Sequence, residues 1–447
     1  MNATLERETI ETRGLPASRA TADVSAALRF ITCGSVDDGK STLIGRLLVD
    51  SKAVLQDQLA GVTRAGETDL ALLTDGLSAE REQGITIDVA YRYFATPQRK
   101  FIIGDAPGHE QYTRNMVTAA SSADAAVVLV DATKLDWRSP DLTLLPQTRR
   151  HSLLLQLLRV PHLIFAVNKL DAVADPSLAF AHIRQALEAF AEQAGLRAQA
   201  IVPVSALTGW NVVSPESDWC GYTGPSLLAL LEALPVTPPE LDLPPSFSVQ
   251  WVEKCHDQAQ TQEGRRIFWG RVNTGTLRVG QSVQVFPSGQ RAQVARLLSA
   301  TRATPAELGG HSGGVVLDRE VDVSRGDWLI DGEADWQPQQ RLTVTLAWLD
   351  DTPLEPGRVY WALHGHRWVK AKVLAITSQL DVHTLVRSRA ERLEANAIGQ
   401  VELQLQQGLL TLPFERSRQL GALVLVDAAT HRTAGAALVT NPSPKAD

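Results

Sequence analysis

The chain has 447 residues, of which 44% are hydrophobic, and a formal net charge of −7 at pH 7. This length is enough for about three domains, and the acidic balance argues against a protein whose main task is to grip nucleic-acid backbones. A run of about eighteen apolar residues, as a membrane-spanning helix needs, does not occur. The three cysteines, Cys33, Cys220 and Cys255, lie far apart; they offer no metal-binding spacing and fit a reducing, cytoplasmic setting.

The first 26 residues mix Glu, Arg, Thr and Ala without an apolar segment. We expect residues 1–26 to form a mobile arm or a tail that contacts a partner. A secretory signal or a membrane anchor would need an apolar stretch that this segment lacks.

A phosphate-binding loop follows the first strand-like run, residues 28–33. A strand that leads a glycine-rich loop into a helix points several backbone N–H groups at one spot, where they can cradle phosphate oxygens. Lys40 can then reach the β- and γ-phosphates, and Ser41 can bind Mg²⁺. The residues expected to bind nucleotide here are Gly34, Ser35, Val36, Asp37, Asp38, Gly39, Lys40, Ser41 and Thr42.

A second motif, Asp-Ala-Pro-Gly-His over residues 105–109, follows the strand-like run 100–104. The Asp105 carboxylate at the end of that strand can hold Mg²⁺ through water. The Gly108 backbone N–H can approach a γ-phosphate because no Cβ intervenes. We therefore expect this loop to sense whether a γ-phosphate is present.

A third motif, Asn-Lys-Leu-Asp, follows the strand-like run 162–167 and predicts the choice of base. The Asp171 carboxylate can accept hydrogen bonds from both N1–H and the exocyclic N2–H₂ of guanine, whereas adenine offers no matching pair of donors. The predicted nucleotide is therefore GTP rather than ATP. A Ser-Ala pair after the run 200–204 would complete the pocket with a backbone N–H directed at guanine O6. The residues expected around the base are Asn168, Lys169, Asp171, Ser205 and Ala206.

The later motifs are common when each occurs alone. Asp-x-x-Gly often marks a turn, and Asn-Lys-x-Asp often forms a solvated loop. Here they follow the phosphate-binding loop in a fixed order, each at the carboxyl end of a strand-like run, which is where open parallel sheets bind ligands. The combination indicates a GTPase.

The chain alternates strand-like and helical patterns up to residue 234. This alternation predicts an α/β domain over residues 27–234, with a mostly parallel sheet covered by helices on both faces. The proline-rich segment 235–245 ends the domain, because neither a helix nor a central strand can persist there. The predicted strands lie at about residues 29–33, 100–104, 125–130, 162–167 and 200–204, and residues 177–194 form the clearest helical pattern.

The rest of the chain shows period-two alternation with glycine turns, which predicts two all-β barrel domains over residues 246–339 and 340–447. His364 and His366 alternate in a strand-like stretch of the second barrel. We interpret this pair as surface residues rather than as a metal site.

With these motifs and the segment Arg-Glu-Gln-Gly-Ile-Thr-Ile at residues 81–87, the chain resembles the translation-factor family of GTPases over nearly everything after residue 26. The resemblance implies that Thr86 joins Ser41 and Asp105 around Mg²⁺ and the γ-phosphate. It also implies that His109 positions the attacking water, with Lys40 and Thr86 as the other catalytic residues. The alternative for His109 is a residue that only caps a helix.

Residues around these motifs carry a narrower resemblance. They are similar to the GTPase subunits of bacterial sulfate adenylyltransferases, while elongation factors share only the core motifs. The resemblance implies a heteromeric enzyme of sulfate assimilation, in which GTP hydrolysis drives a catalytic small subunit to make adenylyl sulfate and pyrophosphate from ATP and sulfate. The segments that carry this resemblance are residues 35–47, 80–94, 108–116 and 147–152.

Two departures from that family pattern stand out. Ala106 occupies a position where the family usually has Thr, which leaves Asp105 and Gly108 intact. Residues 134–146 form a longer segment than in the family, which we interpret as a surface loop; Trp137 keeps a partner contact open as the alternative. Rival functions are a carrier of aminoacyl-tRNA, against which the acidic balance leans, and a regulatory GTPase without attached chemistry.

Overall fold

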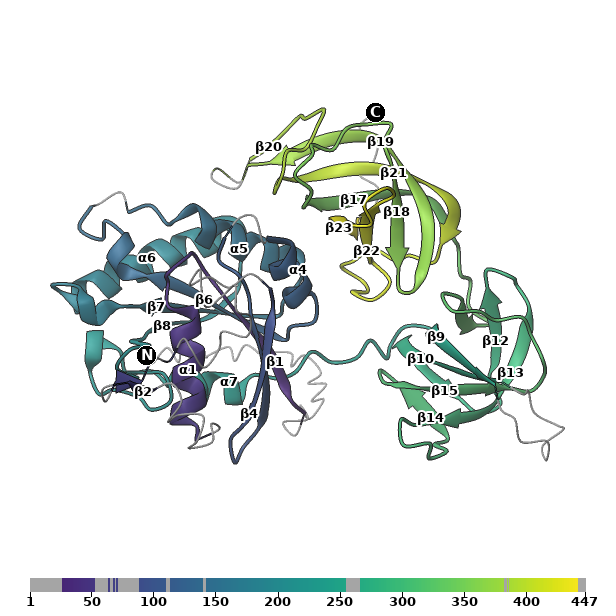
Figure 1. Cartoon of the computed structure of the whole chain (residues 1–447), viewed down its shortest axis with the longest axis horizontal. Coiled ribbons are helices and arrows are strands. Elements are labelled where there is room, and N and C mark those ends of the chain that lie inside the picture. Colours follow the sequence, from purple (N-terminus) through teal and green to yellow (C-terminus); the bar gives the residue numbers. More distant parts are fainter. Residues whose placement is uncertain are drawn as a thin grey trace, which may run out of the picture.

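Three units follow one another along the chain of the computed structural model (Figure 1). They are an α/β unit, a first barrel and a second barrel, which confirms the predicted fold class. The residues described are 26–52, 63–64, 67–68, 70, 88–109, 113–139, 142–254, 266–381, 384 and 386–440. Within these residues, none of the helices has the length and apolarity that crossing a membrane requires.

The α/β unit is built on a six-stranded sheet with the order β4-β5-β1-β6-β7-β8. All neighbours are parallel except β4, which runs antiparallel at the edge and was not predicted as a strand. Its strands are β1 (Leu28–Cys33), β4 (Ala90–Ala95), β5 (Lys100–Asp105), β6 (Ala125–Asp131), β7 (His162–Asn168) and β8 (Ala198–Pro203), with a separate hairpin of β2 (Thr63–Arg64) and β3 (Glu67–Thr68).

Helices cover both faces of this sheet. The central strand β6 is buried along its whole length, as its continuous apolar sequence requires between two helical layers. The ends of α6 show how the sequence sets the helix boundaries: Asp175 caps the first turn by accepting from the Leu178 N–H (3.0 Å), and Gly195 ends the helix in the left-handed region. The helices are α1 (Lys40–Asp50), α4 (Thr113–Ser121), α5 (Pro146–Leu157), α6 (Pro176–Ala194) and α7 (Leu227–Ala233), with the 3₁₀ turns η3 (Ala132–Lys134), η4 (Leu170–Ala172) and η5 (Trp219–Gly221).

The first barrel closes in the order β10-β15-β13-β12-β16-β9. Gly270 allows β10 to lie close to β9, because a Cβ at this position would come within 2.0 Å of the Ser248 carbonyl oxygen. The strands are β9 (Ser246–Lys254), β10 (Arg266–Thr274), β12 (Ser282–Phe286), β13 (Arg291–Leu298), β15 (Ser312–Leu317) and β16 (Trp328–Asp331), with β11 (Thr276–Arg278) and β14 (Glu307–Gly309) paired beside them.

The second barrel is an antiparallel sheet in the order β18-β22-β23-β17-β21-β19-β20. It closes on itself because β18 also pairs with β19 along its whole length. The strands are β17 (Gln339–Trp348), β18 (Val359–His364), β19 (Arg367–Leu380), β20 (Arg387–Ser388), β21 (Ile398–Leu409), β22 (Ala422–Asp427) and β23 (Thr433–Val439).

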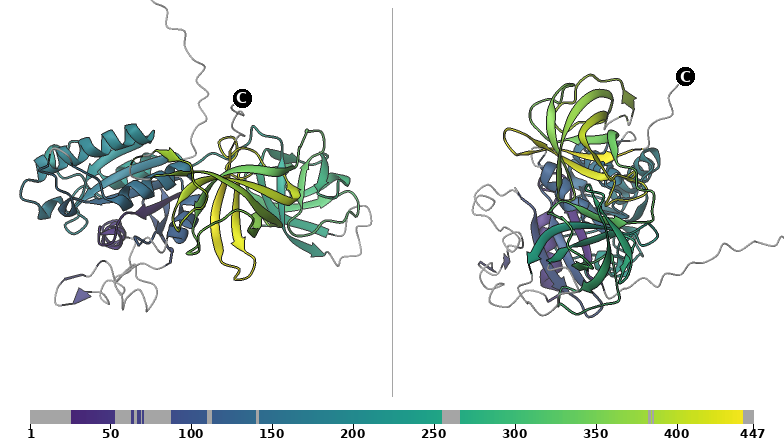
Figure 2. Two further views of the ribbon diagram at one scale, coloured as in Figure 1. Left: turned by 90° about the horizontal axis from the view of Figure 1, so that it is seen from above. Right: turned by 90° about the vertical axis from the view of Figure 1, so that its right-hand side faces the viewer.

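The second barrel packs against the α/β unit along α4 and α5 (Figures 1 and 2). Leu154 and Leu158 belong to the same apolar cluster as Ala347 and Leu438 of the barrel. The Arg159 guanidinium donates to the Phe414 carbonyl oxygen at 2.8 Å. The apolar cluster therefore forms a continuous core between the α/β unit and the second barrel.

The two barrels meet at His364, which corrects the interpretation of this residue as a surface histidine. Its ring is fully buried and stacks on Trp328 of the first barrel, with ring centres 5.1 Å apart. Its Nε2 donates to the Leu420 carbonyl oxygen at 3.2 Å. The sequence could not show this burial, because it results from contact between two units.

Trp137 is also buried, at 8% exposed, and its carbonyl oxygen bonds the His182 ring at 2.8 Å. Lys134, Asp136 and Arg138 beside it are exposed, so the described part of the segment lies at the surface while the indole of Trp137 packs inward. Cys33 is a fully buried core residue beside the phosphate-binding loop, as predicted.

Burial lowers the pKa of His364 to about 4. The folded state thus keeps this ring neutral, while the unfolded chain takes up a proton as the pH falls below about 6.5, so stability is lost between about pH 6.5 and pH 4. We expect the wild type to lose roughly 2 kcal/mol more than His364→Gln between pH 7 and pH 5. Urea denaturation at both pH values measures this; an equal loss in both proteins would contradict it.

Candidate nucleotide-binding site

The predicted phosphate-binding loop runs from β1 into α1 and depends on glycine at position 39. Gly39 has a φ of 92°, in the left-handed region. A Cβ on this residue would lie 2.5 Å from Asn168 Nδ2. The same Nδ2 donates to the Asp38 carbonyl oxygen at 2.8 Å. The Asn-Lys-Leu-Asp motif is therefore hydrogen-bonded directly to the phosphate-binding loop.

Lys40 folds back over this loop. Its Nζ donates to the Ser35 carbonyl oxygen at 2.7 Å, and the residue is 7% exposed. Burial lowers the pKa of Lys40, while the nearby carboxylates of Asp105 and Asp38 act in the opposite direction. Gly108 lies against it, because a Cβ there would come within 2.6 Å of Nζ. The structure thus brings the lysine and the second motif together.

The oxygen ligands expected for Mg²⁺ also meet. Ser41 Oγ donates to Asp105 Oδ2 at 3.4 Å, and Thr32 Oγ1 donates to Asp105 Oδ1 at 3.2 Å. A hydroxyl beside a carboxylate is a donor set that suits Mg²⁺. The third expected ligand, Thr86, lies outside the described residues. His109 follows Gly108 directly and is half-buried.

The residues expected around the base lie on the neighbouring strand ends. Asn168 Oδ1 accepts from the Ala206 N–H at 3.0 Å, so this amide links the base-side loop to the phosphate loop. Lys169 Nζ donates to the Asp37 carbonyl oxygen at 2.6 Å. Asp171 lies one turn further on, in η4, and is exposed. Ser205 is fully buried, and its Oγ accepts from the Thr208 N–H at 3.2 Å.

Two charged residues at and just after the end of β6 pair with the predicted motifs and were missed from the sequence. Lys134 Nζ lies 3.0 Å from the buried Asp38 carboxylate, and Asp131 pairs with Lys169 at 2.8 Å. Burial alone would raise the pKa of Asp131, but hydrogen bonds from Lys169 and Thr133 hold it below its usual range. The sequence could have indicated these residues, because they follow the apolar run 125–130. The carboxyl end of that strand lies at the same edge of the sheet as the predicted motifs.

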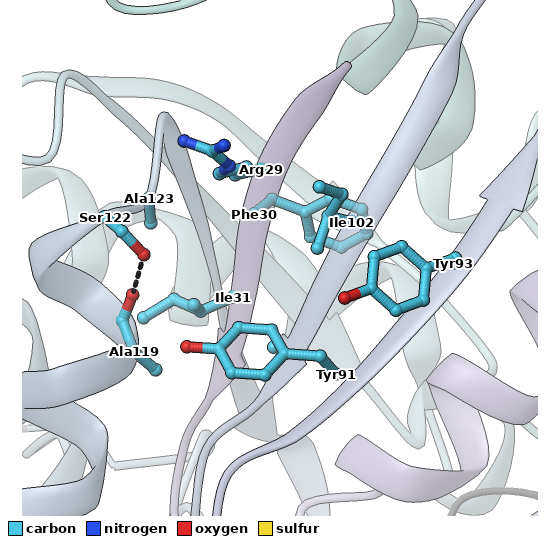
Figure 3. Close-up of a pocket in the computed structure, with 10 residues that line it drawn as sticks. Arg29, Phe30, Ile31, Tyr91, Tyr93, Ile102, Ala119, Ser122 and Ala123 are labelled. Carbon is cyan, nitrogen blue, oxygen red and sulfur yellow. Dashed lines mark hydrogen bonds between the residues drawn. The ribbon is translucent and has the colours of Figure 1, made fainter. Parts of the chain in front are cut away.

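A separate hollow of about 270 Å³ lies between α4 and strands β1, β4 and β5 (Figure 3). Tyr91 and Tyr93 of the edge strand flank it, facing Ser122 at the end of α4. None of the predicted site residues that the structure describes lines this hollow. It therefore lies apart from the candidate nucleotide site.

Two family models match the α/β unit and the second barrel. The elongation factor Tu GTP binding domain family matches residues 25–240, and the GTP-eEF1A C-terminal domain-like family matches residues 341–440. A crystal structure of a bacterial selenocysteine-specific elongation factor is similar with a TM-score of 0.45 and 22% identity, over 94% of this chain and 59% of that one. Fold and motifs together define a GTPase domain of the translation-factor class followed by β-barrels.

Relatives of similar length show which family within this class the chain belongs to. Sulfate adenylyltransferase subunit 1 of Laribacter hongkongensis is 42% identical, over 94% of this chain and 86% of the relative. The subunit 1 of Citrobacter koseri is 40% identical, over 99% of this chain and 92% of the relative. The chain belongs to the sulfate adenylyltransferase subunit 1 family.

The contact between Gly39 and Asn168 predicts a site-specific effect of an added methyl group. We expect Gly39→Ala to weaken guanine-nucleotide binding about tenfold or more, because strain and the clash with Asn168 both displace the loop. Gly357→Ala is a matched control, since Gly357 has a φ of 91° with open space around it in the second barrel. Fluorescent-nucleotide titration measures both. Equal affinities in the two variants would show that the clash does not shape the site.

Proposed function

We propose that this protein binds GTP with Mg²⁺ and hydrolyses it to GDP. The observation that carries the proposal is the convergence of Gly108 and Asn168, from two segments far apart in the sequence, on the loop that carries Lys40. The guanine specificity is assigned to Asp171, whose exposed carboxylate is free to meet the donor edge of the base.

Phosphoryl transfer requires mainly positioning and compensation of negative charge on the γ-phosphoryl oxygens. Lys40 and the loop N–H groups supply positive charge from the protein. Ser41, Asp105 and Thr86 would hold Mg²⁺, which would supply further positive charge against the phosphate oxygens. His109 is proposed to orient the attacking water, because it follows the γ-phosphate-sensing Gly108 directly.

We further propose that this GTPase is the energy-coupling subunit of a cytoplasmic sulfate adenylyltransferase in sulfate assimilation. Its catalytic small subunit transfers the adenylyl group of ATP to sulfate, giving adenylyl sulfate and pyrophosphate. Family membership supports this role. The sequence also lacks His-x-Gly-His, a nucleotide-transfer loop that an adenylyl-transferring active site can use, which supports placing this chemistry on the partner. A partner that binds the GTP and GDP states unequally can draw energy from hydrolysis.

The complex with the small subunit, purified from the native host, tests this role through pyrophosphate release from ATP and sulfate. We expect GTP to stimulate the reaction about tenfold or more, and Lys40→Ala to abolish the stimulation because phosphate-charge compensation is lost. Lys100→Ala, at an exposed lysine on β5, is the control and should respond to GTP like the wild type. Synthesis that proceeds equally without GTP would contradict the coupling.

A further inference from the structure

Helix α5 touches the candidate nucleotide site with one end and the second barrel with the other. Its first turn carries Gln147, which is 8% exposed. Its last turn and the residues after it carry the barrel contacts of Leu154, Leu158 and Arg159. Twelve residues of helix therefore connect the γ-phosphate-sensing loop to another unit of the protein.

Gln147 bonds the sensing loop itself. Its Nε2 donates to the Gly108 carbonyl oxygen at 3.0 Å. The orientation of the amide is fixed by Arg150, which donates from NH1 to Gln147 Oε1 at 2.9 Å. Arginine can only donate, so Oε1 must face Arg150 and the NH₂ group must face Gly108.

This bond acts at Gly108, a residue that has no side chain of its own. Gly108 has the widest conformational freedom of any residue type, and it lies against Lys40 and Ser35 of the phosphate loop. The bonded carbonyl belongs to the peptide that joins Gly108 to His109. Gln147 therefore restrains both the residue expected to sense the γ-phosphate and the residue expected to orient water.

We propose that Gln147 is a positioning residue that ties Gly108, the residue expected to sense the γ-phosphate, to helix α5, and through α5 to the second barrel. The inference deepens the proposed GTPase function and rests on it. A GTP-induced shift of the Gly108 carbonyl would pull on α5 through Gln147. The packed contact of Leu154 and Leu158 would then carry that movement to the barrel.

The chain offers a matched pair of variants on the same helix. Gln147→Met keeps the side-chain length and removes the amide. Gln156→Met does the same at the other end of α5, where Gln156 Nε2 donates to the Ala194 and Gly195 carbonyl oxygens at 2.8 and 3.1 Å. Both glutamines donate to backbone carbonyl oxygens, but only Gln147 reaches the candidate nucleotide site.

Calorimetric titration with GDP and with a non-hydrolysable GTP analogue tests the positioning role. We expect Gln147→Met to keep GDP affinity within about twofold, to weaken analogue binding about tenfold and to lower kcat for GTP hydrolysis more than it changes KM. Gln156→Met should keep the wild-type ratio of the two affinities. Gln147→Glu, which keeps the Arg150 contact but sets a carboxylate against the carbonyl, serves if the Met variant does not fold.

The outcomes separate this inference from the proposed function. A wild type that binds no guanine nucleotide would overturn the function, whereas an unchanged analogue-to-GDP affinity ratio in Gln147→Met would overturn the positioning role alone.

Hydrogen exchange at residues 412–421 of the second barrel tests the connection through α5. We expect the exchange difference between GDP and analogue states to shrink in Gln147→Met. A difference equal to that of the wild type would overturn the connection.

Discussion

The buried amide of Asn168 is the interaction on which the nucleotide site depends. Its Nδ2 holds the Asp38 carbonyl oxygen of the phosphate loop, and its Oδ1 holds the Ala206 N–H of the base-side loop. One side chain at the end of β7 therefore sets the distance between the phosphate loop and the base-side loop. The close approach of Asn168 also explains why position 39 requires glycine, since any Cβ would displace the amide.

Much of this arrangement could be predicted because its causes are local. Strands with continuous apolar sequences end at the same edge of a parallel sheet, so the motifs that follow them must converge. The left-handed φ of Gly39 is a local cause of this kind, whereas its contact with Asn168 and the contact of Gly108 with Lys40 required the fold. The α/β unit and the β-rich remainder were predictable on the same grounds, from the change of hydrophobic period after residue 245.

The missed features depend on contacts between segments that are distant in sequence. His364 looks like one of an alternating exposed pair, yet the packing of one barrel on the other buries its ring against Trp328. In the sequence nothing distinguishes Lys134 from other surface lysines, but in the structure it lies beside the buried Asp38 carboxylate. The contact of Gln147 with Gly108 was hidden for the same reason, although Gln147 lies in a segment that carries the family resemblance.

The central claim is that the loop held by Asn168 receives the phosphates of a guanine nucleotide whose base is read by Asp171. Isothermal titration of the purified chain with GDP and with ADP, both with Mg²⁺, tests it most directly. We expect saturable binding of GDP at one site per chain and no measurable binding of ADP. Binding of the two nucleotides with equal affinity, or of neither, would contradict it.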